Sequence, residues 1–255
     1  MSHRFKIVIP ARHGSTRLSG KPLLDIAGKP MIQHVVERAL ASAADEVVVA
    51  TDDQRIVAAC AGQGVAALLT SADHCSGTDR VAEVIARLGW SDDTIVINLQ
   101  GDEPCMPSAL IDQVAANLAT AEGTGMATLA YPIQASRLLF DPHVVKVVID
   151  AAGFALYFSR APIPWHRDEF QNGQVTLPSA VVFLRHIGLY AYRAAFLKRF
   201  VAWTPSPLEQ AESLEQLRVL WHGERIHVGV AAEEPGPGVD TPEDLARVIQ
   251  WMRES

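Results

Sequence analysis

A segment near the N-terminus combines three cations with two glycines. Arg12, Arg17 and Lys21 follow a short apolar run, and Gly14 and Gly20 lie between them. Glycine gives a backbone the freedom to wrap around an anion, and backbone N–H groups together with fixed cations neutralise a triphosphate. The segment is therefore predicted to bind a polyphosphate, and the alternative is a solvated basic loop.

This predicted phosphate loop differs from two common nucleotide-binding motifs. In a Walker A motif the second glycine follows the first by five positions, and a Ser or Thr after the lysine holds magnesium. Here Gly20 follows Gly14 by six positions, and Pro22 follows the lysine. A GxGxxG dinucleotide fingerprint is also absent from this segment. The spacing counts against a phosphate-loop kinase.

Acidic residues at two distant places are candidate metal ligands. Asp102 and Glu103 lie at the end of a predicted strand, and Asp240 lies far along the chain. Magnesium prefers hard oxygen ligands and is usually held by one or two carboxylates plus substrate phosphates. An Asp before a helix is more often only its cap, but Thr241 is a better candidate for that role and leaves Asp240 available.

A third polar cluster, residues 71–80, joins a predicted strand to a predicted helix. Such a loop can contact a base edge or hold a phosphate at the helix N-terminus. His74, Cys75 and Asp79 do not have the spacing of a zinc site. No nucleophile elbow, HExxH motif or Ser-His-Asp order stands out, so the predicted chemistry is positioning and charge neutralisation rather than covalent catalysis.

Apolar runs and amphipathic segments alternate in the first half of the chain, and this pattern predicts a parallel sheet covered by helices on both faces. Ligands of such sheets bind beyond the carboxyl ends of the strands, where the polar clusters lie. The predicted strands are 5–9, 46–50, 65–69 and 94–99, and the predicted helices are 31–41, 54–61, 79–88 with Thr78 as N-cap, and 107–121.

The second half has strand patterns without long helices between them. We expect an exposed loop at 170–179, one helix at 208–222, and a last helix with Thr241 as N-cap and Pro242 at its first position. No clean linker separates the halves, so the chain is predicted to form one domain over residues 1–255. The predicted strands are 126–133, 144–150, 155–158, 185–192 and 226–231.

Composition limits the function classes. The net charge of −7 argues against a general nucleic-acid partner, which needs basic patches to displace counterions. No apolar stretch is long enough to cross a membrane, and the N-terminal run is too short for a signal peptide. Cys60, Cys75 and Cys105 form no CxxC pair, which suits a reducing compartment. We therefore expect a cytoplasmic protein with no membrane partner.

Seven segments carry a resemblance to a known family over nearly the whole chain. IPARHGSTRLSGKPL (9–23) resembles the N-terminal signature of sugar nucleotidyltransferases, except that Ser19 stands where the family usually has Pro. The other segments together resemble CMP-Kdo synthetases, where Kdo is 3-deoxy-D-manno-octulosonate. They are NLQGDEP (98–104), HVVKVV (143–148), ALYFSRAPIPW (155–165), RHIGLYAYR (185–193), LEQLRVLW (214–221) and GVDTPEDL (238–245). Residues 170–183 are less typical and could alter a rim of the site.

The resemblance implies a reaction and its catalytic residues. The anomeric 2-hydroxyl of Kdo attacks the α-phosphate of CTP, and pyrophosphate leaves. Asp102 and Asp240 would hold a Mg2+ ion, which acidifies the hydroxyl and stabilises developing charge, and Lys21 would act beside them. The residues implied to bind CTP are Arg12, Ser15, Lys21, Ser76, Gly77 and Arg80.

The resemblance also implies a sugar-acid pocket, with cations for the carboxylate and neutral or acidic groups for the hydroxyls. Without the resemblance, Glu215 and Gln216 would be interpreted as an exposed helix face, because both residue types favour surface helices. The implied Kdo-binding residues are Arg17, Gln100, Arg160, His186, Tyr190, Glu215 and Gln216.

The resemblance further implies a three-layer α/β/α Rossmann-like nucleotidyltransferase fold, with a mainly parallel mixed sheet and a smaller antiparallel subdomain. Residues 1–125 would be the CTP-binding half, and residues 126–255 the half for sugar-acid binding and dimerisation in a homodimer. The product would serve lipopolysaccharide synthesis.

Three alternatives remain at this stage. One is the same reaction on 8-amino-Kdo or a sialic acid, because a few pocket atoms decide between a hydroxyl and an amine. The second is a phosphate-loop kinase. The third is a non-catalytic nucleotide sensor, against which the presence of both Asp102 and Asp240 argues.

Overall fold

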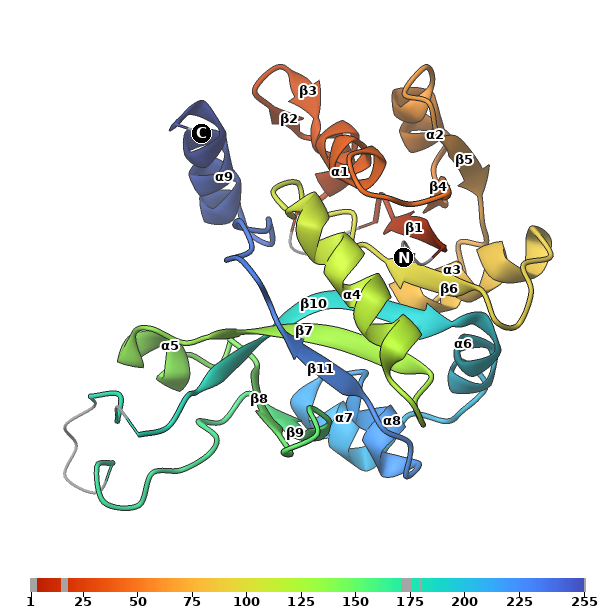
Figure 1. Ribbon diagram of the computed structural model, residues 1–255. Helices are drawn as coiled ribbons and strands as arrows, with labels where there is room; N and C mark the ends of the chain where they lie inside the picture. The colour runs from red at the N-terminus through yellow and green to blue at the C-terminus, as the bar shows by residue number, and fades with distance from the viewer. Residues whose placement is uncertain (1–3, 15–17, 171–175, 179, 255) are drawn as a thin grey trace.

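A computed structural model of the chain describes residues 4–14, 18–170, 176–178 and 180–254. Its centre is a mixed sheet in which seven strands run in the order β11-β7-β10-β6-β1-β4-β5 (Figure 1). The strands are β1 (Phe5–Ala11), β4 (Glu46–Thr51), β5 (Ala66–Leu69), β6 (Ile95–Asn98), β7 (Met126–Pro132), β10 (Leu184–Arg193) and β11 (His227–Val230). Strand β8 (Lys146–Ile149) pairs with β10, and β9 (Ala155–Ser159) pairs with β8.

Strand directions divide the sheet. Strands β1, β4, β5 and β6 pair in parallel, as do β7 and β11. Strand β10 is antiparallel to its neighbours β6, β7 and β8. The expected α/β/α fold with a mainly parallel mixed sheet is confirmed. The antiparallel part of the second half is continuous with the main sheet.

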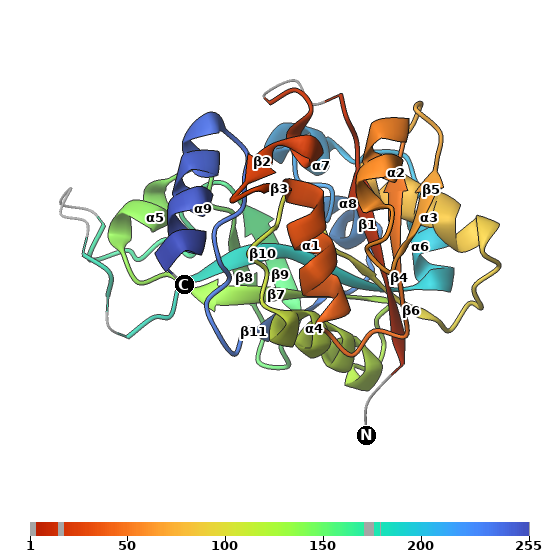
Figure 2. The ribbon, with the colours of Figure 1, turned by 90° about the horizontal axis from the view of Figure 1, so that it is seen from above.

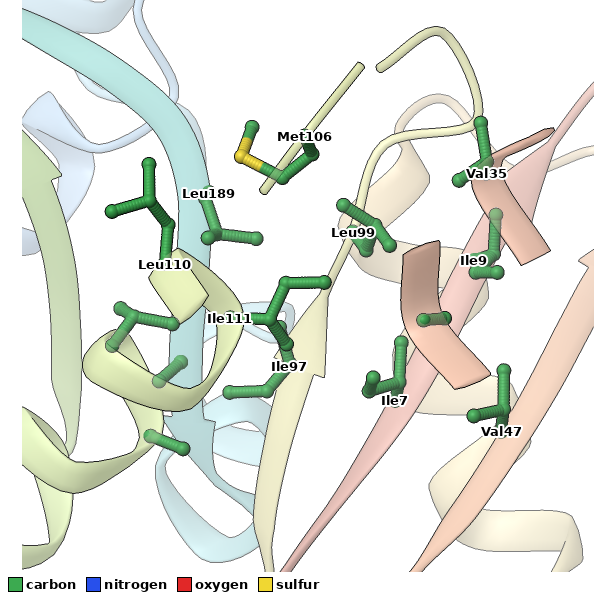
Figure 3. Packing of buried hydrophobic residues seen from close by; sticks show 14 of the residues in the cluster. Ile7, Ile9, Val35, Val47, Ile97, Leu99, Met106, Leu110, Ile111 and Leu189 are labelled. Carbon is green, nitrogen blue, oxygen red and sulfur yellow. The ribbon is translucent and has the colours of Figure 1, made fainter. Parts of the chain in front are cut away.

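Alternate residues of each central strand point to opposite faces of the sheet, which produces two cores. On one face Ile7 and Ile97 pack against α1 (Met31–Leu40) and α4 (Ser108–Thr120), as Figure 3 shows. On the other face Val8 packs with residues of α3 (Gly77–Arg87) and α6 (Ala194–Phe200). The continuous apolar strand patterns are explained by this burial on both faces.

Two helix predictions were wrong in detail. Helix α3 begins earlier than expected, because Ser76 rather than Thr78 is its N-cap and forms a capping box with Asp79. The helix expected over 208–222 is two short helices, α7 (Pro207–Glu212) and α8 (Leu217–Trp221), separated at Ser213 in the left-handed conformation. At this break, the Arg160 side chain donates hydrogen bonds to the carbonyl groups of Glu212 and Ser213.

Several short elements escaped the sequence pattern because they are too brief to show a period. They are η1 (Lys21–Leu23), the β2 (Asp25–Ile26) and β3 (Lys29–Pro30) ribbon, and α5 (Ser136–Phe140). Helix α2 (Gln54–Cys60) was expected. Phe170 was expected in an exposed loop, but it is buried among aromatic rings that include Phe183.

The last helix, α9 (Pro242–Glu254), begins as predicted, since the hydroxyl of Thr241 accepts a hydrogen bond from the Asp244 amide at 3.2 Å. Figure 2 shows α9 beside β2, and Val248 packs there with Ile26 and Met31. Within the part of the chain that the structure describes, no helix has the length and apolar character needed to span a membrane.

Candidate active site

A cavity of about 220 Å³ opens at the carboxyl ends of the parallel strands β1 and β6, the edge where the sequence predicts ligand binding. Its walls come from the loop after β1, the η1 turn, the start of α3, the loop after β6 and the segment before α9. The lining residues are Pro10, Ala11, Arg12, Lys21, Pro22, Met31, His74, Cys75, Ser76, Gly77, Arg80, Gln100, Gly101, Asp102 and Asp240.

The ammonium of Lys21 lies between two carboxylates in this cavity. Its Nζ donates to Asp102 Oδ2 at 2.6 Å and to Asp240 Oδ1 at 3.0 Å. Burial alone would lower the pKa of Lys21, but the charges and hydrogen bonds of Asp102 and Asp240 outweigh it and raise that pKa. Lys21 therefore stays charged at the floor of the site.

Local geometry aims Lys21 inward. The preceding residue, Gly20, has a φ of 67°, and its amide donates to the His13 carbonyl at 3.1 Å. Glycine adopts this left-handed conformation without the strain of a side chain. The turn closes the phosphate loop on itself and directs the next residue, Lys21, into the cavity.

The two aspartates meet because a backbone bond joins their loops. The Val239 amide donates to the Asp102 carbonyl at 2.9 Å, beside Asp240. The amide and hydroxyl of Thr241 are occupied in capping α9 through Asp244. Asp240 is thus not needed as the cap, and its side chain accepts a hydrogen bond from Lys21.

Glu103, next to Asp102, is partly exposed and is not part of the cavity lining. A Cβ at Gly238 would lie 3.0 Å from its Oε1. Burial, then the charges of Asp102 and Asp240, raise the pKa of Glu103 to about 8. A protonated Glu103 avoids a third negative charge beside the two aspartates.

The N-terminus of α3 forms a second wall. Its cap Ser76 and its first residue Gly77 both line the cavity, and Gly77 packs so closely that a Cβ there would lie 3.2 Å from Pro10 Cγ and 3.5 Å from Gln100 Oε1. Backbone amides and the helix dipole at such a terminus favour anions. This wall suits the negatively charged part of a nucleotide.

Arg80 reaches the cavity, but other residues hold its guanidinium. Nη2 donates to Asp52 Oδ2 at 2.9 Å, and Nη1 donates to the Thr70 hydroxyl and to the Ser71 carbonyl. Only 3% of the Arg80 side chain is exposed. Arg80 therefore braces the loop before α3 and offers little free surface to a base.

The imidazole of His74, which lies near Cys75 and Asp79 in the sequence, pairs with the carboxylate of Glu83. Its Nε2 lies 2.5 Å from Glu83 Oε2 on α3. His74, Cys75 and Met31 line the cavity although they were not predicted as site residues. His74 and Cys75 could have been predicted as cavity residues because they lie within the polar segment 71–80. Nothing in the sequence indicated Met31.

His186 and Tyr190 lie on β10 in a mostly aromatic layer. His186 Nε2 is 3.0 Å from the Thr128 hydroxyl, and its ring stands edge-on to Phe158 at 5.1 Å. Burial lowers the pKa of His186 to about 3, so the imidazole is neutral. The Tyr190 ring lies between those of His186 and Tyr192, at 5.3 and 5.9 Å.

The interpretation of Glu215 and Gln216 as an exposed helix face was wrong. Gln216 is 4% exposed, and Glu215 accepts a hydrogen bond from the Thr78 hydroxyl at 2.6 Å. Burial raises the pKa of Glu215 even though Thr78 and Arg218 oppose the rise. The break between α7 and α8 turns both residues inward.

The predicted residues therefore fall into two groups. The first surrounds the cavity and consists of Arg12, Lys21, Ser76, Gly77, Arg80, Gln100, Asp102 and Asp240. The second lies outside its lining and consists of Arg160, His186, Tyr190, Glu215 and Gln216, with Glu215 joined to α3 through Thr78. Ser15 and Arg17, which were also predicted, lie outside the described residues.

The carboxylates of Asp102 and Asp240 are of the ligand type that magnesium prefers. Asp102 and Asp240 present carboxylate oxygens that share one ammonium, so the oxygens lie close together. Across the described ranges, no group of three or more His, Cys, Asp or Glu side chains is arranged to hold a metal. Two carboxylates fit magnesium that completes its shell with substrate phosphates and water.

The chain is similar to known proteins over nearly its whole length. The family model described as "Cytidylyltransferase" matches residues 6–226. A curated 3-deoxy-manno-octulosonate cytidylyltransferase from Pseudomonas fluorescens is 62% identical over 252 residues, which cover 99% of each chain. A solved structure of CMP:2-keto-3-deoxy-manno-octonic acid synthetase complexed with CTP superimposes with a TM-score of 0.88 at 44% identity, again over 99% of each chain.

Proposed function

The chain belongs to the cytidylyltransferase family, and from this premise we propose that it transfers CMP from CTP to Kdo, releasing CMP-Kdo and pyrophosphate. One observation carries the proposal. Lys21, Asp102 and Asp240 converge in a cavity whose far wall is the N-terminus of α3. A cation and an anion-binding helix end suit a triphosphate.

The proposed reaction is an in-line displacement at phosphorus. The oxygen of the Kdo 2-hydroxyl bonds to the α-phosphorus of CTP, and its proton passes to solvent. The bond between the α-phosphorus and the oxygen that bridges the α- and β-phosphates breaks. Pyrophosphate leaves with that oxygen. No covalent intermediate with the protein is needed, so the residues act by positioning and neutralisation.

The cavity residues have separate tasks in this scheme. Arg12, exposed at the rim, and Lys21, at the floor, would neutralise the triphosphate. The amide of Gly77, at the start of α3, would donate to an anionic oxygen, because the Ser76 amide already donates to Asp79 Oδ2 at 3.0 Å. Ser15 is proposed to assist Arg12 by the family resemblance alone. Arg80 would keep the loop before α3 in place for the nucleotide.

We propose that Asp102 and Asp240 hold Mg2+ when substrate is present. The ion would supply Lewis-acid stabilisation of charge on the α-phosphate and acidify the attacking hydroxyl. The two side chains remain 36% and 58% exposed, which leaves access for an ion. Until the ion binds, Lys21 compensates their charge.

We propose that the sugar acid binds between Gln100 of the cavity and the layer formed by His186, Tyr190, Glu215 and Gln216, with the Arg160 guanidinium binding its carboxylate. Arg17 is proposed to assist by the family resemblance alone. The neutral imidazole of His186 suits a hydroxyl rather than a carboxylate. The bond from Thr78 to Glu215 connects this layer to the nucleotide wall.

The proposed assembly is a homodimer formed through the second half of the chain. Large apolar side chains remain exposed there, with Leu156 60%, Trp165 57% and Val182 70% exposed. Such side chains mark contact surfaces when they gather in a patch. Light scattering coupled to size exclusion should give twice the 27.7 kDa chain mass; a monomer at micromolar concentration would contradict the dimer.

We also propose a cytoplasmic location. The structure leaves Cys60, Cys75 and Cys105 as free thiols, and Cys60 and Cys105 are buried. Free thiols persist in a reducing compartment. The proposal agrees with the use of CTP as a substrate.

The decisive experiment measures pyrophosphate release from CTP and Mg2+, with and without Kdo. We expect release that depends on Kdo, falls sharply when ATP replaces CTP, and stops with EDTA. Faster release with 8-amino-Kdo or a sialic acid would change the substrate. CTP binding without turnover for every sugar acid would overturn the enzymatic proposal in favour of a sensor.

A further inference from the structure

A lysine of β8 that belongs to neither group of site residues is completely buried. Lys146 has 0% exposure, and its Nζ donates to three main-chain carbonyls: Asp141 at 2.8 Å, Val144 at 2.6 Å and Arg160 at 2.6 Å. An ammonium has three donors, and here each has one acceptor. Lys146 is therefore fully satisfied by the backbone of two segments.

A buried charge is costly unless its partners compensate it. Burial lowers the pKa of Lys146, and the distant carboxylates of Asp141 and Glu212 oppose that shift. A methionine of similar length would fill the space without this cost. The ammonium instead closes the turn before β8 and joins it to the end of β9, so its contribution is the shape of the backbone at Arg160.

Glu212, the last residue of α7, binds the same end of β9 that Lys146 contacts. Its Oε1 accepts from the Ser159 hydroxyl at 2.6 Å, and its Oε2 accepts from the Arg160 amide at 2.9 Å. Figure 1 shows β9 next to α7 and α8. Arg160 is thereby fixed by its main-chain N through Glu212 and by its main-chain O through Lys146.

The side chain of Arg160 is fixed as well. Nε donates to the Glu212 carbonyl at 2.6 Å, Nη1 to the Pro142 carbonyl at 2.9 Å, and Nη2 to the Ser213 carbonyl at 3.5 Å. Two of these carbonyls are available because α7 ends at Glu212. Throughout the described part of the chain, no carboxylate forms an ion pair with this guanidinium, so its charge is free to meet an anion.

Residues 212–213 lead directly into the segment that contains Glu215 and Gln216. Glu215 and Gln216 follow closely after Ser213, and Glu215 bonds to Thr78 near the start of α3. A shift of the 212–213 backbone would therefore displace both Arg160 and Glu215.

We propose that Lys146 and Glu212 are positioning residues that hold Arg160, and through residues 212–213 the Glu215 segment, in the arrangement that binds the carboxylate and hydroxyls of the sugar acid. This inference rests on the proposed function of the site. Neither residue contacts the nucleotide cavity, so their effect is confined to the acceptor side of the reaction.

The first test uses the full chain with Lys146→Met and Glu212→Gln. Lys198→Met is a matched control, since Lys198 is exposed and pairs with Asp92 on the surface. At saturating CTP and Mg2+, Lys146→Met should raise the KM for Kdo about tenfold or more, and Glu212→Gln should raise it less. The dissociation constant for CTP, measured calorimetrically without Kdo, should change less than about twofold. An unchanged KM for Kdo, or an equal loss of CTP affinity, would overturn the inference.

A double-mutant cycle tests whether Lys146 acts through Arg160. In an Arg160→Ala background, Lys146→Met should add little to the KM for Kdo, because the group that Lys146 positions is already absent. Independent, multiplicative effects would instead show a general structural role. If Lys146→Met folds poorly, the effect of Glu212→Gln on the KM for Kdo in the Arg160→Ala background provides the same test.

Hydrogen exchange separates this inference from the proposed substrate. Lys146→Met should speed amide exchange in peptides covering 155–161 and 212–216 and leave α2 and β4 unchanged, whichever sugar acid is bound. If the wild-type chain is inactive with Kdo, the proposed transfer of CMP to Kdo is overturned. The amide exchange rates of the Lys146→Met variant would still decide whether Lys146 positions Arg160. Unaltered exchange in both peptides would overturn the positioning role itself.

Discussion

The arrangement of Lys21 between Asp102 and Asp240 determines the chemistry proposed for the site. Each carboxylate alone would be an ordinary surface group, since both side chains remain partly exposed. Their shared contact with one buried ammonium keeps two negative charges close together without a metal. The same pair can exchange part of that interaction for a divalent ion when the triphosphate brings one.

Substitution of either aspartate should separate catalysis from folding. Asp102→Asn or Asp240→Asn removes an anionic ligand and should abolish most Mg2+-dependent pyrophosphate release. The midpoint of thermal unfolding should change little, because each aspartate is partly exposed and Lys21 keeps the other aspartate as its partner. Asp92→Asn, in the surface ion pair with Lys198, is the control. Near-normal magnesium-dependent rates in both active-site variants would refute the ligand assignment.

His186 should make stability depend on pH in a defined direction. Its pKa is lowered from 6.5 to about 3 by burial, so between these values the unfolded chain takes up a proton that the folded chain does not. The free energy of unfolding must therefore fall as pH decreases through this window. Urea unfolding of wild type and His186→Gln at pH 7 and pH 5 should show a smaller loss in the variant. Equal losses would mean that His186 is protonated in the folded state.

Among the elements, the connections around β1, β6 and α3 bring the walls of the cavity together. The parallel pairing of β1 with β6 puts the loops after both strands at one edge of the sheet. Gly77 and Gly101 then allow these loops and α3 to approach more closely than side chains would permit. The capping box of Ser76 fixes where α3 begins, and so fixes which amides face the cavity.

Gly101→Ala should test this close approach. A Cβ at Gly101 would lie 2.8 Å from the Pro10 carbonyl oxygen, so the loop after β1 or the loop after β6 must shift. We expect a loss of stability of about 1–3 kcal/mol and weaker CTP binding. Gly188→Ala is the matched control, because a Cβ at that position would have nothing within 4 Å. A fully stable Gly101→Ala protein with normal CTP affinity would show that the contact does not shape the site.

On the scale of the whole molecule, the two halves of the chain are joined within one sheet. Strand β10, from the second half, is hydrogen-bonded on one side to β6 of the first half and on the other to β7. The two cores likewise contain residues from both halves, such as Ile97 with Leu189 and Val96 with Tyr192. The cavity residues and the layer that contains His186 and Tyr190 therefore lie on one continuous framework.

This continuity predicts that the chain unfolds as one unit. Urea transitions followed by far-ultraviolet circular dichroism and by tryptophan fluorescence should coincide, with a single calorimetric peak. A fragment of residues 1–125 should not fold, because β6 would lose its neighbour β10. Two resolved transitions would instead indicate halves that fold independently, contrary to the single domain predicted from the sequence.

The sequence by itself determined the alternation of strands and helices, the α/β class and the polar clusters at the strand ends. These follow from local periodicity and from turn residues, which neighbours in the chain already specify. The start of α9 at Thr241 and Pro242 was predictable for the same reason. Where local signals were brief or competed, as at Ser76 against Thr78, the predicted boundary was displaced along the chain.

Only the tertiary structure decided which of these groups meet. Lys21 is separated by 81 residues from Asp102 and by 219 from Asp240, and no local pattern records such contacts. The break at Ser213 is likewise not encoded nearby, because the Arg160 side chain that binds the freed carbonyls comes from the end of β9. A helix pattern describes which residues share a face. Packing against the rest of the molecule decides whether that face lies in water or, as with Glu215 and Gln216, against other elements of the chain.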